Sequence, residues 1–185
     1  MSTRIPRLEM NELAPSVQET LAPRVKRLGY LGEFFKTSGH VPEVLVPFME
    51  MTEALKLALP DRLTEVGALT VAGVMGNVYE RNQHERLSEK LGFGRDWVAA
   101  VNRLDPDAAG PLSEDERAVQ RLALKVLRDH GHGVRDEFET VVRRLGHAEA
   151  MGVLFLIGRY AMHSYVVNVL ELAPPVPSIF DPPKP

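Results

Sequence analysis

Prolines divide the chain into segments that allow long helices and segments that do not. The 185 residues include 14 prolines, yet none lies between Asp61 and Asp105 or between Leu112 and Ala173. A proline inside a helix costs about 3 kcal/mol, because it lacks the amide hydrogen and its ring clashes with the preceding turn. We therefore expect the long helices of the fold in these two proline-free segments.

Apolar residues in these segments recur at helical rather than strand spacing. Intervals of three and four residues separate the members of two sets, which are Ala118, Leu122 and Val126, and Phe138, Val141, Val142 and Leu145. No segment shows the sustained two-residue alternation of a half-buried strand. We predict an all-α fold with short loops between the helices and no sheet.

Capping signals set the expected helix boundaries. Ser113 and Glu116 have the spacing of a capping box, and glycines follow several expected helix ends. From these signals we expect helices at 61–75, 113–130, 136–145 and 147–172, with a loop at 104–112. Two further helices, at 15–28 and 42–59, are predicted with interruptions at Pro23 and Pro47.

Composition argues against several classes of function. The net charge is -3 and no basic cluster stands out, which argues against a nucleic-acid partner because phosphate binding needs clustered Lys and Arg. The chain has no cysteine, which excludes disulfides, thiolate metal sites and thiol catalysis. The N-terminal MSTRIPRLEM has no apolar signal core, so we expect a cytoplasmic protein.

The longest apolar run, 148–172, raises the question of a membrane span. Polar or charged residues interrupt it, among them Glu149, Arg159, His163 and Asn168. Such residues would cost a membrane span several kcal/mol of transfer free energy. We therefore predict a buried helix of a soluble protein and no membrane partner.

We expect one all-α domain at 1–173, in which residues 1–12 form an extended arm. Residues 174–185 contain six prolines, so they should form an extended, polyproline-like tail. Ile179 and Phe180 offer this tail an apolar anchor on a protein surface. The alternative is a disordered tail, because chain termini often lack order.

The stretch GNVYERNQH, 76–84, places a dense polar cluster directly after the apolar EVGALTVAGVM. On one straight helix, Glu65 and His84 would lie about 28 Å apart and could not share a site. Gly76 followed by Asn77 predicts that one helix ends and another begins there, because glycine favours helix termination and asparagine favours initiation. A chain reversal at Gly76 would let Glu65 return to meet His84.

The helix that starts at Asn77 carries a stripe at intervals of four, three and four residues. The stripe consists of Glu80, His84, Leu87 and Leu91, so we expect His84 to point toward the interior. A simpler interpretation stays open. Glu80 and His84 would then form an ordinary surface pair, and Glu80 would be only the capping partner of Asn77.

Four of these residues resemble a family signature. Glu65, Asn77 twelve residues later, Glu80 three further and His84 four beyond look like the motif of the carboxymuconolactone decarboxylase and alkylhydroperoxidase-D-like family. In its peroxidase branch, the two middle positions are a Cys-x-x-Cys pair. In its decarboxylase-like branch, the second is commonly glutamate after a tyrosine, and VYERNQH is similar to that form.

Two longer segments extend the resemblance over most of the chain, from about Phe34 to Leu172. FLIGRYAMHSYVVNVLEL resembles the family's closing helix, with Tyr160 and Asn168 at matching places, and FFKTSGHVPEVLVPFMEM resembles its early helix pair. The resemblance implies a compact all-α, AhpD-like domain that assembles as a dimer, trimer or hexamer, with a pocket beside the motif histidine. It does not imply peroxidase activity, which needs a low-pKa thiolate.

The closing helix supports the expectation of a homo-oligomer independently. Apolar residues surround nearly its whole circumference, among them Val153, Leu154, Phe155, Leu156, Ile157, Val166, Val167, Val169 and Leu170. A domain of this size has limited core to cover such a helix. Helices of this kind are usually central or shared between subunits.

The motif suits proton transfer without a cofactor. Decarboxylation leaves an electron-rich carbon that must be protonated, and a histidine of near-neutral pKa is a natural acid for that step. We therefore expect a lyase or isomerase that acts on a small carboxylated or lactone-like metabolite. His84 would be the acid/base and Glu65 its orienting partner, while Glu80 would either assist the chemistry or only cap the helix.

Candidates for contact with the substrate are Asn77, Arg81, Tyr160 and His163. Each of two candidates has an equally good alternative role. Arg81 would form an ion pair with a neighbouring residue, and Tyr160 would pack in the core. The alternative function is a non-catalytic, small-molecule-binding or scaffolding homo-oligomer of the same fold. Solvent access to His84 distinguishes the two, because a sealed pair with Glu65 would indicate a structural role.

No metal or other cofactor is expected. His130 and His132 form a His-x-His on a loop, but the neighbouring sequence offers no third ligand. The simpler interpretation is that these histidines lie at a helix end, where they interact with the helix dipole.

Overall fold

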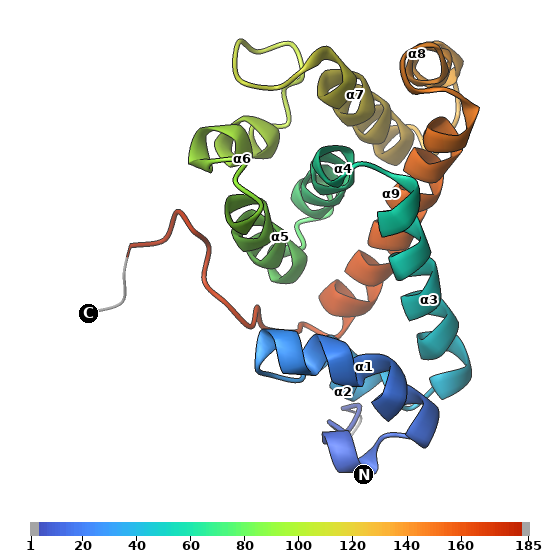
Figure 1. The fold of residues 1–185 in the computed structure, drawn as a ribbon, viewed down its shortest axis with the longest axis vertical. Helices are drawn as coiled ribbons and strands as arrows, with labels where there is room; N and C mark the ends of the chain where they lie inside the picture. Colours follow the sequence, from blue (N-terminus) through green and yellow to red (C-terminus); the bar gives the residue numbers. More distant parts are fainter. Residues whose placement is uncertain (1–3, 183–185) are drawn as a thin grey trace. The chain divides into compact units, whose positions relative to one another are not determined.

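The computed structural model describes residues 4–182, and within that range it contains helices and no β-strand. The helices are the 3-10 helix η1 (Met10–Glu12) and the α-helices α1 (Pro15–Leu28), α2 (Glu33–Ser38), α3 (Pro42–Ala58), α4 (Asp61–Val74), α5 (Val78–Lys90), α6 (Arg95–Asn102), α7 (Glu114–Arg128), α8 (Arg135–Leu145) and α9 (His147–Val169) (Figure 1). The predicted all-α class is confirmed.

The chain groups into two compact units, 1–54 and 55–185. Helix α3 begins in the first unit and ends in the second. A single domain at 1–173 stays a prediction. The arm predicted at 1–12 includes the 3-10 helix η1, and residues 1–3 lie outside the described part of the chain.

Helices η1, α1 and α2 and most of α3 form the first unit. The rings of Phe34 in α2 and Phe48 in α3 pack with their centroids 5.7 Å apart. The amide of Leu8 donates to the carbonyl of Lys36 at 3.0 Å, which ties the chain before η1 to α2. A small aromatic and aliphatic core therefore organises this unit.

Helix α4 is the centre of the second unit, where it packs against α5, α6, α7 and α9 (Figure 1). It buries ten consecutive residues, from Leu63 to Ala72. Gly67 allows a close approach to α9, since a Cβ there would lie 2.5 Å from a methyl carbon of Leu156. Burial on all sides explains why this stretch is almost wholly apolar and places Glu65 in the interior.

The predicted break near Gly76 is confirmed. Helix α4 ends at Val74, Gly76 adopts a φ of +64°, and α5 begins at Val78. The side chain of Asn77 accepts a hydrogen bond from the amide of Glu80 at 3.0 Å, so Asn77 is the N-cap of α5. The turn brings α5 back along α4, which is the arrangement that the Glu65–His84 pairing requires.

The other predicted boundaries agree with the structure to within a few residues. Ser113 and Glu116 form the reciprocal capping box at the start of α7, as predicted. Helix α9 ends at Val169, three residues before the expected end at Leu172. The chain turns at Glu171, whose φ is +51°, because the prolines that begin at Pro174 prevent further helix.

The predicted interruptions at Pro23 and Pro47 were wrong, and one helix was missed. Helices α1 and α3 continue through Pro23 and Pro47 without interruption. Each proline removes one backbone hydrogen bond, but buried residues such as Val17 and Phe48 stabilise these helices by packing. Helix α6 was not predicted, although Trp97, Val98 and Val101 have helical spacing and are fully buried.

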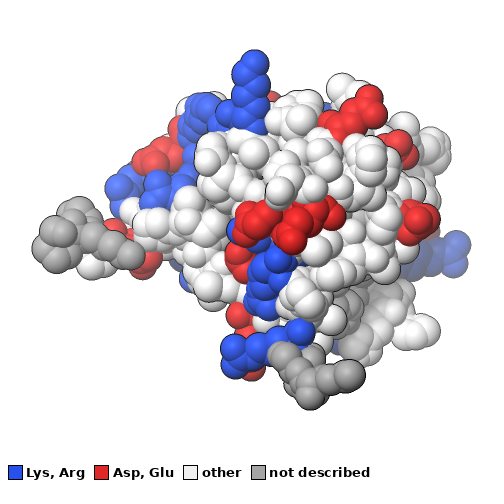
Figure 2. Space-filling view, turned by 90° about the horizontal axis from the view of Figure 1, so that it is seen from below, with Lys and Arg blue, Asp and Glu red and all other residues white. Residues whose placement is uncertain are grey.

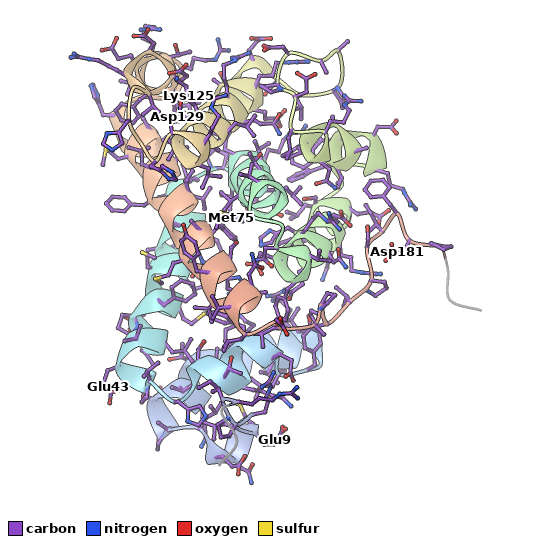
Figure 3. All side chains as sticks on the ribbon, turned by 180° about the vertical axis from the view of Figure 1, so that it is seen from behind. Glu9, Glu43, Met75, Lys125, Asp129 and Asp181 are labelled. Atoms are coloured by element: carbon purple, nitrogen blue, oxygen red, sulfur yellow. The ribbon has the colours of Figure 1, made fainter. Side chains whose placement is uncertain are left out.

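The tail after α9 docks on its own unit, as predicted, along α5 and α6 (Figures 1 and 3). Ile179 is buried, whereas Phe180 is 45% exposed and lies under the guanidinium of Arg95. Asn82 donates to the carbonyl of Val176 at 2.9 Å. Residues 183–185 lie outside the described part of the chain.

Helix α9 is long and apolar enough to cross a membrane by length and composition alone, yet 56% of its most apolar window is buried inside the protein. That burial is typical of a core helix, as expected from its sequence. The face drawn in Figure 2 mixes acidic and basic side chains. A cytoplasmic location and the lack of a nucleic-acid partner stay predictions.

Candidate active site

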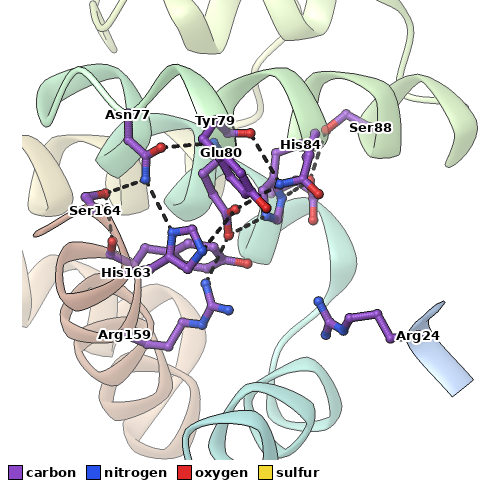
Figure 4. Close-up of polar contacts among 12 residues, drawn as sticks. Arg24, Asn77, Tyr79, Glu80, His84, Ser88, Arg159, His163 and Ser164 are labelled. Atoms are coloured by element: carbon purple, nitrogen blue, oxygen red, sulfur yellow. Dashed lines mark hydrogen bonds and ion pairs between the residues drawn. The ribbon is translucent and has the colours of Figure 1, made fainter. Parts of the chain in front are cut away.

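Glu65 and His84 meet in the interior of the second unit, and Figure 4 shows His84 among its polar neighbours. Nδ1 of His84 lies 2.7 Å from Oε2 of Glu65, although the two residues are 19 positions apart in the sequence. Ser88, one turn after His84 on α5, donates to the same Glu65 oxygen at 3.2 Å. Two donors thus fix the carboxylate of Glu65, which in turn orients the imidazole.

Glu80 is the second carboxylate and the most connected member of the cluster (Figure 4). Its Oε1 lies 3.1 Å from Nη1 of Arg159 and 3.5 Å from Nε2 of His84. Its Oε2 lies 3.6 Å from Nε2 of His163. The carboxylate therefore faces three basic side chains, and its role is not that of the helix-capping partner considered from the sequence.

The side chain of Asn77 both caps a helix and contacts α9. Its oxygen caps α5, and its amide nitrogen donates to the hydroxyl of Ser164 at 3.0 Å and approaches Nδ1 of His163 at 3.4 Å. Ser164 in turn donates to the carbonyl of Tyr160 at 2.8 Å. Asn77 therefore joins the start of α5 to α9 and positions His163 beside Glu80.

Tyr160 packs edge-on against the imidazole of His84, with ring centroids 5.1 Å apart. The guanidinium of Arg159 lies over the same tyrosine ring at 4.2 Å. Tyr160 is almost fully buried. It thus belongs both to the core and to the wall of the site, so the two interpretations of this residue are compatible.

The carboxylates control the ionisation of His84. Burial by itself would lower the pKa of His84, but the charge and hydrogen bond of Glu65 and the adjacent Glu80 raise it to about 9. This differs from the near-neutral pKa expected from the sequence. His84 is consequently an imidazolium at neutral pH.

Burial would also raise the pKa of Glu80, but His163, His84 and Arg159 together hold it well below its usual range. Glu80 is therefore a carboxylate under all ordinary conditions. The side chains of Glu65, Glu80, Arg159 and His163 are nearly sealed from solvent, whereas that of His84 remains 11% exposed. His84 is therefore the most exposed of these five side chains.

Of the two roles that the sequence left open for Arg81, the structure shows the ion pair with a neighbour, since its Nε lies 3.6 Å from Oε1 of Glu85. The expectation that Leu87 and Leu91 point toward the interior was wrong. Leu91 is 40% exposed and Leu87 only half-buried, so the leucine stripe is not the inner face of the helix. The buried side chains of α5 are mainly polar, since that face meets the acids and bases of α4 and α9.

Arg159 and Ser88 are site residues that the sequence analysis did not assign. A signal for Arg159 was present, because it is the only cation in the apolar run 148–172 and lies one helical turn before His163. Ser88 lies one turn after His84 in the same way. Within residues 4–182, no group of three or more His, Asp or Glu side chains is arranged to hold a metal ion.

No protein-family model and no curated protein matches the sequence. Solved structures do match the fold. The debrominase Bmp8 in its apo form superposes with a TM-score of 0.80 at 18% identity, over 94% of this chain and 93% of that one. An uncharacterized peroxidase-related protein from Ralstonia eutropha JMP134, described as an alkylhydroperoxidase AhpD core, gives 0.76 at 21% identity, over 92% and 91%.

A third structure, an uncharacterized peroxidase-related protein from Silicibacter sp. TM1040, gives a TM-score of 0.75 at 18% identity, over 94% of this chain and 95% of that one. Likeness at these identities shows the fold. The chain therefore has the AhpD-like fold, as the motif and the closing helix led us to expect.

Proposed function

We propose that this protein is a cofactor-free lyase or isomerase, similar to carboxymuconolactone decarboxylases, that transfers protons on a small carboxylated or lactone-like metabolite. One observation carries the proposal. A partly exposed histidine lies between two buried carboxylates from different helices, 2.7 Å from Glu65 and 3.5 Å from Glu80. Acid–base catalysis needs a positioned proton carrier of this kind.

His84 is proposed to act as a general acid. In a decarboxylation, the electrons of the breaking C–C bond move to the α-carbon, CO2 leaves, and the resulting enolate carbon takes the proton from Nε2 of His84. Glu65 holds Nδ1 throughout and stabilises the correct ring orientation. Because its pKa is about 9, the histidine then regains a proton from water at neutral pH.

Thiol chemistry has no place in this proposal. The two positions that resemble the peroxidase cysteines are Asn77 and Glu80, and both are already engaged in the polar network. An isomerisation would use the same histidine, whose neutral form would accept a proton from one carbon and whose imidazolium would return it to another, while Glu65 and Glu80 hold the ring in place. Both reactions need only the side chains of the chain itself.

A non-catalytic binding protein is the second candidate. It is favoured by the near-complete burial of Glu80, Arg159 and His163, whose charges already compensate one another. Such a network resembles a structural core as much as an active site. The exposed edge of His84 would then only contact a bound ligand.

The decisive experiment is a panel of 3-oxo acids and lactones assayed for CO2 release and for loss of substrate. The panel should also include 2,3,4-tribromopyrrole, because a crystal of Bmp8 with a cysteine replaced by alanine contains that compound. We expect turnover of a carboxylated or lactone compound, reduced roughly 10²–10⁴-fold by His84→Gln. The matched control is His132→Gln, which changes an exposed loop histidine.

Two outcomes would contradict the enzyme proposal. Turnover that His84→Gln leaves unchanged would remove His84 from the chemistry. Saturable binding of a panel member without any product, measured by calorimetry, would instead support the binding protein.

A further inference from the structure

Two histidines flank the carboxylate of Glu80 at nearly equal distances. Nε2 of His84 lies 3.5 Å from Oε1, and Nε2 of His163 lies 3.6 Å from Oε2. Tyr79 of α5 also faces His163, with ring centroids 6.0 Å apart, and Arg159 lies one helical turn before His163 on α9 and reaches the same carboxylate. The distances to Glu80 therefore do not decide which of the two rings carries an extra proton.

The two rings differ in what lies at their other nitrogen. Nδ1 of His84 lies 2.7 Å from a carboxylate oxygen of Glu65, an acceptor that holds a proton on that nitrogen. Nδ1 of His163 lies 3.4 Å from the side-chain nitrogen of Asn77 (Figure 4). An amide nitrogen only donates, so this contact uses the lone pair of Nδ1. The ring of His163 then keeps its single proton on Nε2, toward Glu80.

Two other contacts fix the orientation of the Asn77 amide. Its oxygen accepts the backbone N–H of Glu80 at 3.0 Å. Its nitrogen donates to the hydroxyl oxygen of Ser164 at 3.0 Å, and that hydroxyl gives its own hydrogen to the carbonyl of Tyr160. A reversed amide would place its nitrogen against the N–H of Glu80, so that two donors would face each other. The nitrogen of Asn77 therefore stays toward His163.

The charges of the buried cluster agree with a neutral His163. Arg159 and protonated His84 supply two positive charges, and Glu65 and Glu80 supply two negative ones. A third positive charge, on His163, would leave these side chains with a net charge in a nearly dry interior. Burial of an uncompensated charge is strongly destabilising.

We propose that Asn77 is a positioning residue that keeps His163 neutral, as the Nε2–H tautomer, and thereby directs the extra proton of the site to His84. One imidazolium and one neutral imidazole then share the carboxylate of Glu80. The neutral ring still presents its N–H to Glu80, so it holds this carboxylate in place. The inference rests on the proposed function, because it explains why His84 and not His163 is the general acid.

Nuclear magnetic resonance of the whole chain, with ¹⁵N-labelled histidine at pH 7, measures the protonation of each ring directly. The ring nitrogen shifts distinguish an imidazolium from each of the two neutral tautomers. The chain has six histidines, so the signals of two of them are identified by their loss in His84→Gln and His163→Gln. We expect an imidazolium at His84 and the Nε2–H tautomer at His163. An imidazolium or an Nδ1–H tautomer at His163 would overturn the proposal.

Exchange of the amide for a carboxylate tests the role of Asn77 itself. Asn77→Asp retains an oxygen that caps α5, because aspartate is an equally good N-cap. It replaces the donor at Nδ1 of His163 by an acceptor, so His163 should take up a second proton. The spectrum at pH 7 should then show one more imidazolium than that of the wild type. A neutral His163 in this variant would overturn the proposal.

Ser164→Ala is the matched control, since it removes the other acceptor of the Asn77 nitrogen and retains the amide and both histidines. This control should keep the Nε2–H tautomer of His163. An imidazolium there would overturn the proposal, because contact between α5 and α9 would then set the charge instead of the amide.

The wild-type spectrum decides the proposal even if a variant does not fold. None of these spectra needs a substrate. A lack of turnover in the substrate panel would count against the proposed function alone, so the two failures are distinguishable.

Discussion

Nη1 of Arg159 lies 3.1 Å from Oε1 of Glu80, and both side chains are almost completely buried. The two residues are 79 positions apart, and their pairing joins the start of α5 to the middle of α9. A buried cation and a buried anion each require the other, because an unpaired charge in the interior is strongly destabilising. The pair therefore makes the position of the candidate acid–base groups depend on the packing of α9.

Removal of one partner of this pair should destabilise the protein strongly. For Arg159→Met we expect a loss of about 3–5 kcal/mol in the free energy of unfolding, measured in urea, because the buried carboxylate of Glu80 loses the guanidinium that pairs with it at 3.1 Å. The double variant Arg159→Met, Glu80→Met should recover much of that loss. Equal losses in the single and double variants would show that the charges of Arg159 and Glu80 do not compensate each other.

The stability should fall at alkaline pH because of His84. Its pKa is about 9 in the folded protein against 6.5 for an ordinary histidine. Protonated His84 therefore contributes on the order of 3 kcal/mol to the free energy of unfolding. This contribution is fully present below pH 6.5 and declines as the pH rises through 9.

The measurement is the free energy of unfolding of the wild type and His84→Gln between pH 6 and 10. The difference between the two curves should shrink over the range from pH 6.5 to 9. Parallel curves would show that Glu65 and Glu80 do not hold a proton on His84.

The docked tail should contribute measurably to stability through Ile179. Burial of this side chain within the second unit predicts a loss of about 2–4 kcal/mol in the free energy of unfolding for Ile179→Ala. Phe180→Ala, at a residue that is 45% exposed, serves as the matched control and should cost less. Hydrogen exchange at 176–181 should accelerate in Ile179→Ala only, and rapid exchange in the wild type would contradict docking.

Gly76 should resist substitution for reasons of backbone conformation alone. Its φ is +64°, and no atom lies within 4 Å of an added Cβ. Gly76→Ala should therefore cost about 1–2 kcal/mol, and Gly76→Asn distinctly less, because asparagine tolerates the left-handed conformation. Thermal unfolding of the two variants makes the comparison. An equal cost would point to steric contact instead of backbone strain.

Short-range features of the sequence were sufficient to predict most of the helices and their boundaries. The proline-free segments, the Ser113–Glu116 capping box and the Gly76–Asn77 junction each act within a few residues, so their consequences could be predicted directly. The junction also predicted that Glu65 returns to His84. The prediction that Pro23 and Pro47 interrupt their helices was wrong, because tertiary packing outweighed the local backbone cost of each proline.

The composition of the polar cluster was decided only in the tertiary structure. No spacing rule relates Glu80 to Arg159 or Asn77 to Ser164, because these contacts exist only once α5 and α9 have both packed on α4. The protonation of His84 has the same origin. An isolated imidazole titrates near 6.5, and the shift to about 9 arises from two carboxylates that folding brings to it in a nearly dry interior. The sequence by itself determined most of the helix boundaries and the turn at Gly76 that lets Glu65 meet His84, whereas the packing of α5 and α9 on α4 determined the charge that His84 carries.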